Sequence, residues 1–130
     1  MDAITTRHAV TVTFDRDASP KFTFDPAGES HISTAFGVVT YLLTPKPLTV
    51  RFPSNPVQWI DNETNRRPID QPKGTEITRA PGRAAVRIDT AQAPDKLVFY
   101  LLVETEDGNF FGSDPTIVTM LPPGGGSGGR

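Results

Sequence analysis

The stretch KLVFYLLVE, residues 96 to 104, decides the fold, because seven consecutive apolar residues lie between a lysine and a glutamate. The run is far shorter than the ~18 apolar residues that suggest a membrane span. A short apolar run between turn signals is typical of a strand in the interior of a sheet. We therefore expect residues 96 to 104 to form a central β-strand.

A second stretch, HISTAFGVVTYLL at residues 31 to 43, is also apolar on both of its faces. Such continuity would also suit a buried helix. Its five β-branched residues, its glycine at position 37 and the TPKP that follows it favour a strand instead. We expect a second central strand here, with a bulge at Gly37.

The rest of the chain alternates short apolar patterns with turn signals. HAVTVTF and KFTFD show the two-residue period of half-buried strands, and the DRDASP between them favours a hairpin turn. Asp-Gly in TEDGN supplies the positive φ that tight hairpins require. Residues 61 to 76 are polar and contain two prolines and a glycine, so we expect a surface loop. Further strands are expected at 48–52, 56–60, 76–80, 83–89 and 110–121.

These patterns predict an all-β fold of seven or eight strands. When two sheets pack together, each strand buries one face away from water. An immunoglobulin-like β-sandwich is therefore the first expectation, and a small β-barrel is the alternative. Residues 1–121 are expected to form one sandwich domain. Residues 122–130 form a Gly/Ser-rich stretch without apolar content, which is typical of a flexible tail.

Composition excludes several chemistries. The formal charge of −2 lacks the basic excess of proteins that bind nucleic acid or anionic membranes, so we expect neither partner. The chain has no cysteine, which removes disulfides, thiolate zinc sites and cysteine nucleophiles. The first ten residues lack the pattern of a secretory signal. A cytoplasmic location is the resulting expectation.

Three aspartates in the first hairpin, Asp15, Asp17 and Asp25, are the candidate metal ligands. The opening D-x-D-x-S resembles the start of an EF-hand loop, but the positions that need glycine and glutamate hold Pro20 and Pro26. The aspartates are therefore interpreted as turn residues. A looser calcium site stays open as the alternative, provided that the hairpin brings the three carboxylates together. No other cofactor is expected.

Trp59, Arg66 and Arg67 are the candidate ligand or partner residues. Trp59 lies on an expected strand with Val57 on the same face, which favours a core position. The alternative is a stacking platform for a sugar ring beside the polar loop. Arg66 and Arg67 in that loop carry guanidinium groups that can bind a carboxylate or phosphate through two hydrogen bonds.

The segments KFTFDPAG, VVTYLL and GSDPTIVTMLP give the chain a resemblance to a known family. In this order and spacing they resemble the DP-EP family of small bacterial proteins, over most of residues 8 to 121. The local motifs of the resemblance are the two Asp-Pro dipeptides at positions 25 and 114. The resemblance implies a β-sandwich without an assigned activity, and it implies no catalytic residues.

The expected function is that of a non-enzymatic interaction module. Such a module would present the 61 to 76 loop or a sheet edge to a protein partner or to another copy of the chain, which would also hide edge strands. A calcium- or carbohydrate-binding domain is the alternative, based on Trp59 and the aspartates. A hydrolase whose catalytic residues come from distant positions is the third hypothesis.

Overall fold

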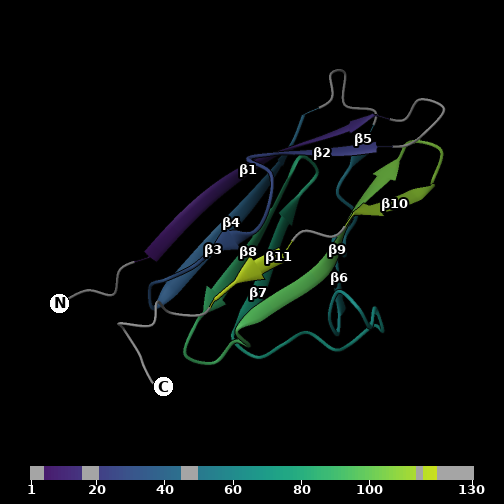
Figure 1. The fold of residues 1–130 in the computed structure, drawn as a ribbon. Coiled ribbons are helices and arrows are strands. Elements are labelled where there is room, and N and C mark those ends of the chain that lie inside the picture. The colour runs from purple at the N-terminus through teal and green to yellow at the C-terminus, as the bar shows by residue number, and fades with distance from the viewer. Residues whose placement is uncertain (1–4, 16–20, 45–49, 114–115, 120–130) are drawn as a thin grey trace.

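The protein is an all-β double layer. The structure, a computed structural model, describes residues 5–15, 21–44, 50–113 and 116–119. These residues form eleven strands and no helix (Figure 1). The expected tail at residues 122–130 lies outside the described residues. No helix long and apolar enough to cross a membrane occurs in the part of the chain that the structure describes.

The first sheet has five strands in the order β2-β1-β4-β8-β7. β1 runs parallel to β4, and the other three neighbouring pairs are antiparallel. β1 and β2 form the hairpin that the alternating apolar pattern predicted. The bounds are β1 (Thr5–Asp15), β2 (Lys21–Asp25), β4 (Phe36–Leu43), β7 (Thr75–Ala80) and β8 (Arg83–Asp89).

The second sheet has six strands built around β9. Two short strands, β5 and β6, pair with one edge of β9, while β10 and β11 pair with its other edge and β3 pairs with β11. Among the described strands the two sheets stay separate and no closed barrel forms, so the sandwich is confirmed over the barrel. The bounds are β3 (Ser30–His31), β5 (Val50–Arg51), β6 (Val57–Ile60), β9 (Lys96–Thr105), β10 (Phe110–Ser113) and β11 (Thr116–Val118).

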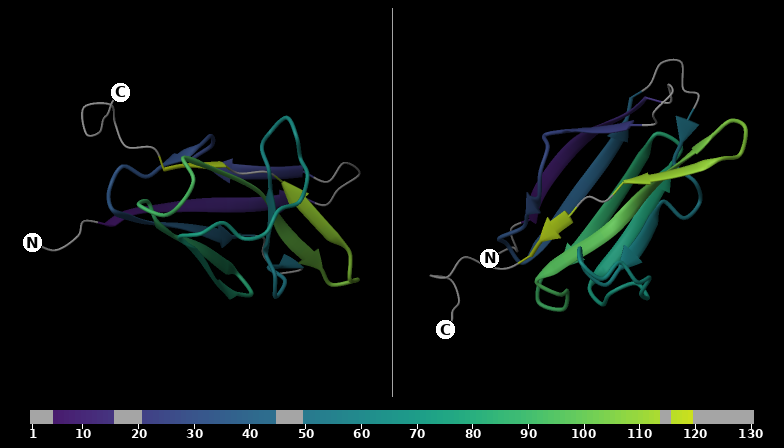
Figure 2. Two further views of the ribbon diagram at one scale, coloured as in Figure 1. Left: turned by 90° about the horizontal axis from the view of Figure 1, so that it is seen from below. Right: turned by 45° about the vertical axis from the view of Figure 1, so that its right-hand side comes forward.

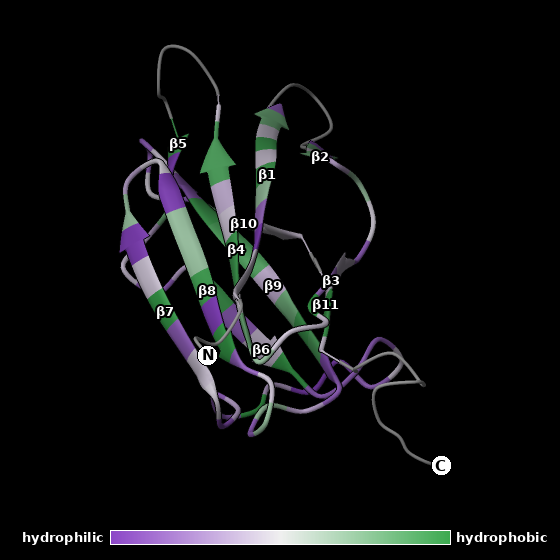
Figure 3. Cartoon of the chain, turned by 90° about the vertical axis from the view of Figure 1, so that its left-hand side faces the viewer, coloured by the Kyte–Doolittle hydropathy of each residue, from purple (hydrophilic) through white to green (hydrophobic). Residues whose placement is uncertain are grey.

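The core lies between the two sheets, which Figure 2 shows from two further directions. β4 contributes Val39 and Tyr41 and β9 contributes Phe99 and Leu101, all at most 1% exposed. Tyr41 packs edge-on against Phe99 at a centroid distance of 6.2 Å. Figure 3 shows the alternation as hydrophobic and hydrophilic bands along β1, β7 and β8. Both continuous apolar runs therefore supply central strands, as predicted.

The count of seven or eight strands was wrong, because continuous stretches divide between pairing partners. Residues 31 to 43 were expected as one strand, but Ser30–His31 pair with β11 in the second sheet while Phe36–Leu43 belong to the first. The closing stretch of residues 110–121 likewise contains two strands, β10 and β11. Periodicity reports an extended backbone and cannot report which neighbour that backbone pairs with.

The bulge expected at Gly37 is absent, because the pairing registers of β4 with β1 and β8 run through Gly37 without interruption. The glycine instead makes room for Ile32. A Cβ at position 37 would lie 2.6 Å from both Cδ1 and Cγ2 of that fully buried side chain. Close packing between segments of the two sheets is therefore the reason for glycine here.

The polar loop predicted for 61–76 folds back over the free edge of β6. The Ile69 amide donates to the Trp59 carbonyl at 3.0 Å, the Asp61 amide donates to the Arg67 carbonyl at 2.9 Å, and Pro68 forms a bridge with Ile60. Covering an edge in this way prevents it from pairing with another chain. The loop therefore has a structural role in protecting the second sheet.

Candidate functional site

The outer face of the five-stranded sheet carries an apolar stripe on its middle strand. Alternation along β4 points Gly37, Val39, Tyr41 and Leu43 into the core, and the other four residues point outward. The outward residues are Phe36, Val38, Thr40 and Leu42. Phe36 is 42% exposed and Leu42 is 37% exposed. Large apolar side chains that are exposed together at the centre of a sheet face indicate an interaction surface, whereas single apolar side chains scattered over the surface do not.

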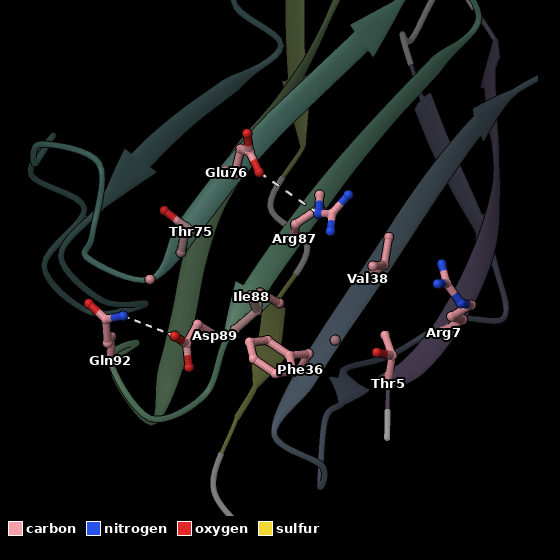
Figure 4. Close-up of a pocket in the computed structure, with 12 residues that line it drawn as sticks. Thr5, Arg7, Phe36, Val38, Thr75, Glu76, Arg87, Ile88, Asp89 and Gln92 are labelled. Carbon is pink, nitrogen blue, oxygen red and sulfur yellow. Dashed lines mark hydrogen bonds and ion pairs between the residues drawn. The ribbon is translucent and has the colours of Figure 1, made fainter. Parts of the chain in front are cut away.

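A pocket of about 480 Å³ lies over one end of this stripe (Figure 4). Phe36 and Val38 form its apolar floor, and Arg7, Glu76 and Arg87 stand around them. These residues come from four of the five strands of the sheet, β1, β4, β7 and β8. The site is therefore a property of the sheet face, which no single segment of sequence contains.

The charged groups of the site lie in one row across the sheet. Arg7 pairs with Val38, Val38 pairs with Arg87, and Arg87 pairs with Glu76 in the strand registers. The Nε atom of Arg87 lies 3.8 Å from Oε1 of Glu76, and both side chains are largely exposed. Arg7 makes no ion pair with any other residue that the structure describes. The row thus has a positive end at β1 and a negative end at β7.

Asp89, the other carboxylate at the pocket, is occupied by the turn that follows β8. Its Oδ1 accepts from the Ala91 amide at 3.1 Å, and its Oδ2 accepts from Nε2 of Gln92 at 2.9 Å. Gly74 closes the same corner, because its carbonyl accepts from the Asp89 amide at 2.7 Å. This carboxylate caps the turn and forms part of the pocket wall.

The first hairpin keeps apart Asp15 and Asp25, two of the three aspartates considered as calcium ligands. The strand register pairs Asp15 with Lys21 and Asp25 with Thr11, so the two carboxylates lie four residues apart along the hairpin. At about 3.4 Å per residue this is roughly 14 Å, whereas ligands of one calcium ion lie within about 5 Å of one another. Asp17 lies outside the described residues. Among the described residues no group of three potential metal ligands was found.

Trp59 is a core residue, as the strand pattern favoured. It is 5% exposed and its ring lies 5.1 Å from that of Phe99. A sugar-stacking platform requires one free ring face, and the indole of Trp59 does not offer one. The alternative interpretation of Trp59 is therefore corrected, because the strand that carries it turns the indole toward the interior.

Arg66 and Arg67 are held by their own surroundings. Nη2 of Arg67 lies 3.2 Å from Oδ2 of Asp61, and Nη1 of Arg66 donates to the Tyr100 hydroxyl at 3.3 Å while its guanidinium lies over the Tyr100 ring. Glu63 of the same loop accepts from Nζ of Lys96 at 2.8 Å. These contacts fix the loop on β9, so the two arginines act first as structural groups.

Lys96 joins that loop to the start of β3. Its ammonium lies 2.8 Å from Glu63 and 3.6 Å from Glu29. The pKa of Lys96 is raised above its ordinary value, first because Glu63 accepts its hydrogen bond and further because both carboxylates attract the positive charge. The Lys96 side chain is exposed, so water screens these interactions.

Sequence reasoning missed the face of β4. The signal was present in the apolar character of both faces of residues 36–43, but it was interpreted as a strand at the centre of a sandwich. Arg7, Arg87 and Glu76 carry no common motif, because strand pairing alone brings them into one row. Comparisons with protein-family models, with curated proteins and with solved structures gave no match.

Proposed function

We propose that the protein is a non-enzymatic interaction module that self-associates through the outer face of its five-stranded sheet. The observation that carries the proposal is the exposure of Phe36 and Leu42 on the middle strand of that face. An exposed apolar centre surrounded by charged side chains is the usual anatomy of a protein-binding surface. Burying this stripe against another protein removes apolar area from water.

The row formed by Arg7, Val38, Arg87 and Glu76 supports a second copy of the chain as the partner. A two-fold axis parallel to the strands, between β4 and β8, exchanges the two ends of the row. It places Arg7 of one copy opposite Glu76 of the other, twice in each dimer. The same axis places Val38 against the aliphatic stem of Arg87. The row of Arg7, Val38, Arg87 and Glu76 is thus complementary to itself in charge.

The size of the face predicts weak association. Four strands at about 4.8 Å spacing and eight residues at about 3.3 Å rise give a face of roughly 500 Å² per copy. The total of about 1,000 Å² is at the lower limit of specific interfaces. We therefore expect a dissociation constant on the order of micromolar to hundreds of micromolar, and a dimer that exchanges readily.

Sedimentation velocity of the full chain over a range of concentrations tests the proposal. We expect the unmodified chain to dimerise, and we expect Arg7→Glu alone and Glu76→Arg alone to lose dimer because each places like charges opposite one another. An equimolar mixture of the two variants restores both opposite-charge pairs and should recover the dimer. A monomer at all concentrations, or a mixture that stays monomeric, would overturn the two-fold arrangement.

Site-specific photo-crosslinking separates self-association from binding to a different protein. A photoreactive residue at Val38 should crosslink to another copy of the chain, while one at Phe110, exposed on the other sheet, serves as the control. Crosslinks from Val38 only to a different protein would support the module and overturn self-association. Absence of any crosslink specific to Val38 would overturn both.

Three finer expectations stay predictions. The resemblance to the DP-EP family and the cytoplasmic location rest on the sequence alone. The immunoglobulin-like connectivity also rests on the sequence alone. The sheets of an immunoglobulin domain are antiparallel, whereas each sheet here contains one parallel pair of strands. The proposed interaction surface depends on none of the three.

A further inference from the structure

A cavity of about 200 Å³ lies between the two sheets, on the opposite side of β4 from the self-association face. Val10, Phe24 and Tyr41 line it from β1, β2 and β4 of the first sheet. Ser30 and Thr116 line it from β3 and β11 of the second sheet. The cavity thus opens where the edges of the two sheets meet, beside the segment of residues 26–29 that connects them.

Tyr41, one of the residues that line this cavity, carries a buried hydroxyl without a hydrogen-bond partner among the described residues. Tyr41 is 1% exposed, and its hydroxyl oxygen makes no hydrogen bond within the described residues. A buried donor that is left unsatisfied costs about 1–3 kcal/mol, and such groups are rare in native proteins. Burial also raises the pKa of this phenol far above its ordinary value, so the group stays a neutral donor at any physiological pH. Its proton therefore has no acceptor among the described residues.

The remaining lining restricts the chemistry of such a molecule. Phe24 and Val10 supply apolar surface, and a carboxylate of Glu29 at the rim disfavours an anion. Glu29 itself is already held by Lys96 at 3.6 Å and lies 3.7 Å from Nε2 of His31. A cavity of roughly 150 Å³ is known to be large enough for one six-membered ring, so about 200 Å³ leaves room for a small substituent.

We propose that this cavity binds a neutral, mostly apolar small molecule of about one six-membered ring, whose oxygen accepts a hydrogen bond from the Tyr41 hydroxyl. Apolar walls with one or a few fixed polar groups are typical of small-molecule sites. The site is independent of the self-association face, because Tyr41 and Val10 point into the interior while that face points outward. Binding can therefore succeed or fail without affecting dimerisation.

Cyclohexanone is a suitable probe, since it has the required size and a single carbonyl acceptor, and methylcyclohexane is its counterpart without an acceptor. Titrations of the full chain are followed by the methyl resonances of Val10 in two-dimensional NMR. Cyclohexanone should bind the unmodified chain about tenfold more tightly than the Tyr41→Phe variant, while methylcyclohexane should bind both equally. Tyr100→Phe, the same change at the other tyrosine and outside the cavity, is the control and should leave both affinities unchanged.

Each other outcome overturns the proposal. Equal affinity of cyclohexanone for the unmodified chain and for Tyr41→Phe would show that the hydroxyl makes no contact with the probe. Absence of nuclear Overhauser effects between cyclohexanone and Val10 or Phe24 in the unmodified chain would show that the cavity holds only water, and this measurement needs no variant to fold.

Discussion

The guanidinium of Arg79 donates two hydrogen bonds to the carbonyl oxygen of Phe52, at 3.0 Å from Nε and 2.5 Å from Nη2. Arg79 belongs to β7, the edge strand of the first sheet, and Phe52 follows β5 in the second sheet. The Phe52 amide in turn donates to the carbonyl of Pro81, the residue that follows β7. These bonds fasten the two sheets together along one side of the sandwich.

Replacing Arg79 should therefore weaken the contact between the sheets. Hydrogen bonds from charged donors contribute about 1.5–3 kcal/mol, and partial exposure reduces this, so Arg79→Met should lower the free energy of unfolding by about 1–2 kcal/mol. Urea unfolding followed by Trp59 fluorescence measures the loss. Arg83→Met, an exposed arginine on the neighbouring strand, is the control and should change stability by less than about 0.5 kcal/mol. Equal losses in both variants would contradict the assignment.

Gly37 should tolerate no larger residue, because its Cα lies against the Ile32 side chain. We expect Gly37→Ala to cost about 1–3 kcal/mol through overpacking. Gly82→Ala is the matched control, since a Cβ at position 82 meets nothing within 4 Å. In the Ile32→Ala background the clashing atoms are gone, so Gly37→Ala should cost about 1 kcal/mol less there. Additive losses in this double-mutant cycle would show that the two residues do not interact.

Carbohydrate should leave the emission of Trp59 unchanged. This residue is the only tryptophan, and its indole is enclosed by the core, so its spectrum reports unfolding and little else. Titration with glucose, galactose and N-acetylglucosamine is expected to shift neither the wavelength nor the intensity of emission, while urea moves the maximum to longer wavelength. A saturable change with any of these sugars would show that the ring is accessible to a ligand.

Any change in melting temperature that calcium causes should not require Asp15 and Asp25 to act together. Because the hairpin register separates the two carboxylates, we expect the change in melting temperature on adding calcium to be the same for the unmodified chain and for Asp25→Asn. Asp95→Asn, in the turn before β9, controls for the loss of one negative charge. A calcium-dependent stabilisation that disappears only in Asp25→Asn would contradict the register.

Tyr41 should make stability fall at alkaline pH. Burial raises its pKa in the folded state above the ordinary value of 10.0, so above about pH 10 the unfolded chain loses the phenol proton and the folded chain keeps it. The folded state then binds more protons, and stability declines by about 1.4 kcal/mol per pH unit from this group. The stabilisation is fully present below pH 10. Unfolding free energies measured from pH 9 to pH 11 should show a shallower decline in Tyr41→Phe than in Tyr100→Phe, and equal slopes would contradict the burial of Tyr41.

The sequence by itself determined the class of fold, because strand periodicity and turn chemistry are local properties. Alternation along HAVTVTF and KFTFD predicted the first hairpin, and Asp-Gly predicted the turn in which Gly108 has a φ of 87°. The apolar runs around Val39 and Phe99 predicted the two strands that build the core. The polar composition of residues 61 to 76 predicted a surface loop, although not that this loop covers the edge of β6.

Only the tertiary structure decided which faces stay open and which distant residues meet. β4 and β9 are both apolar on both faces, yet β4 exposes Phe36 and Leu42 because no described element packs on the outer side of its sheet. Strand pairing produces the row of Arg7, Val38, Arg87 and Glu76, whose first and last members in the sequence, Arg7 and Arg87, lie 80 positions apart. The unpartnered hydroxyl of Tyr41 likewise results from two sheets closing on each other. Such relationships depend on register and packing, which no local pattern encodes.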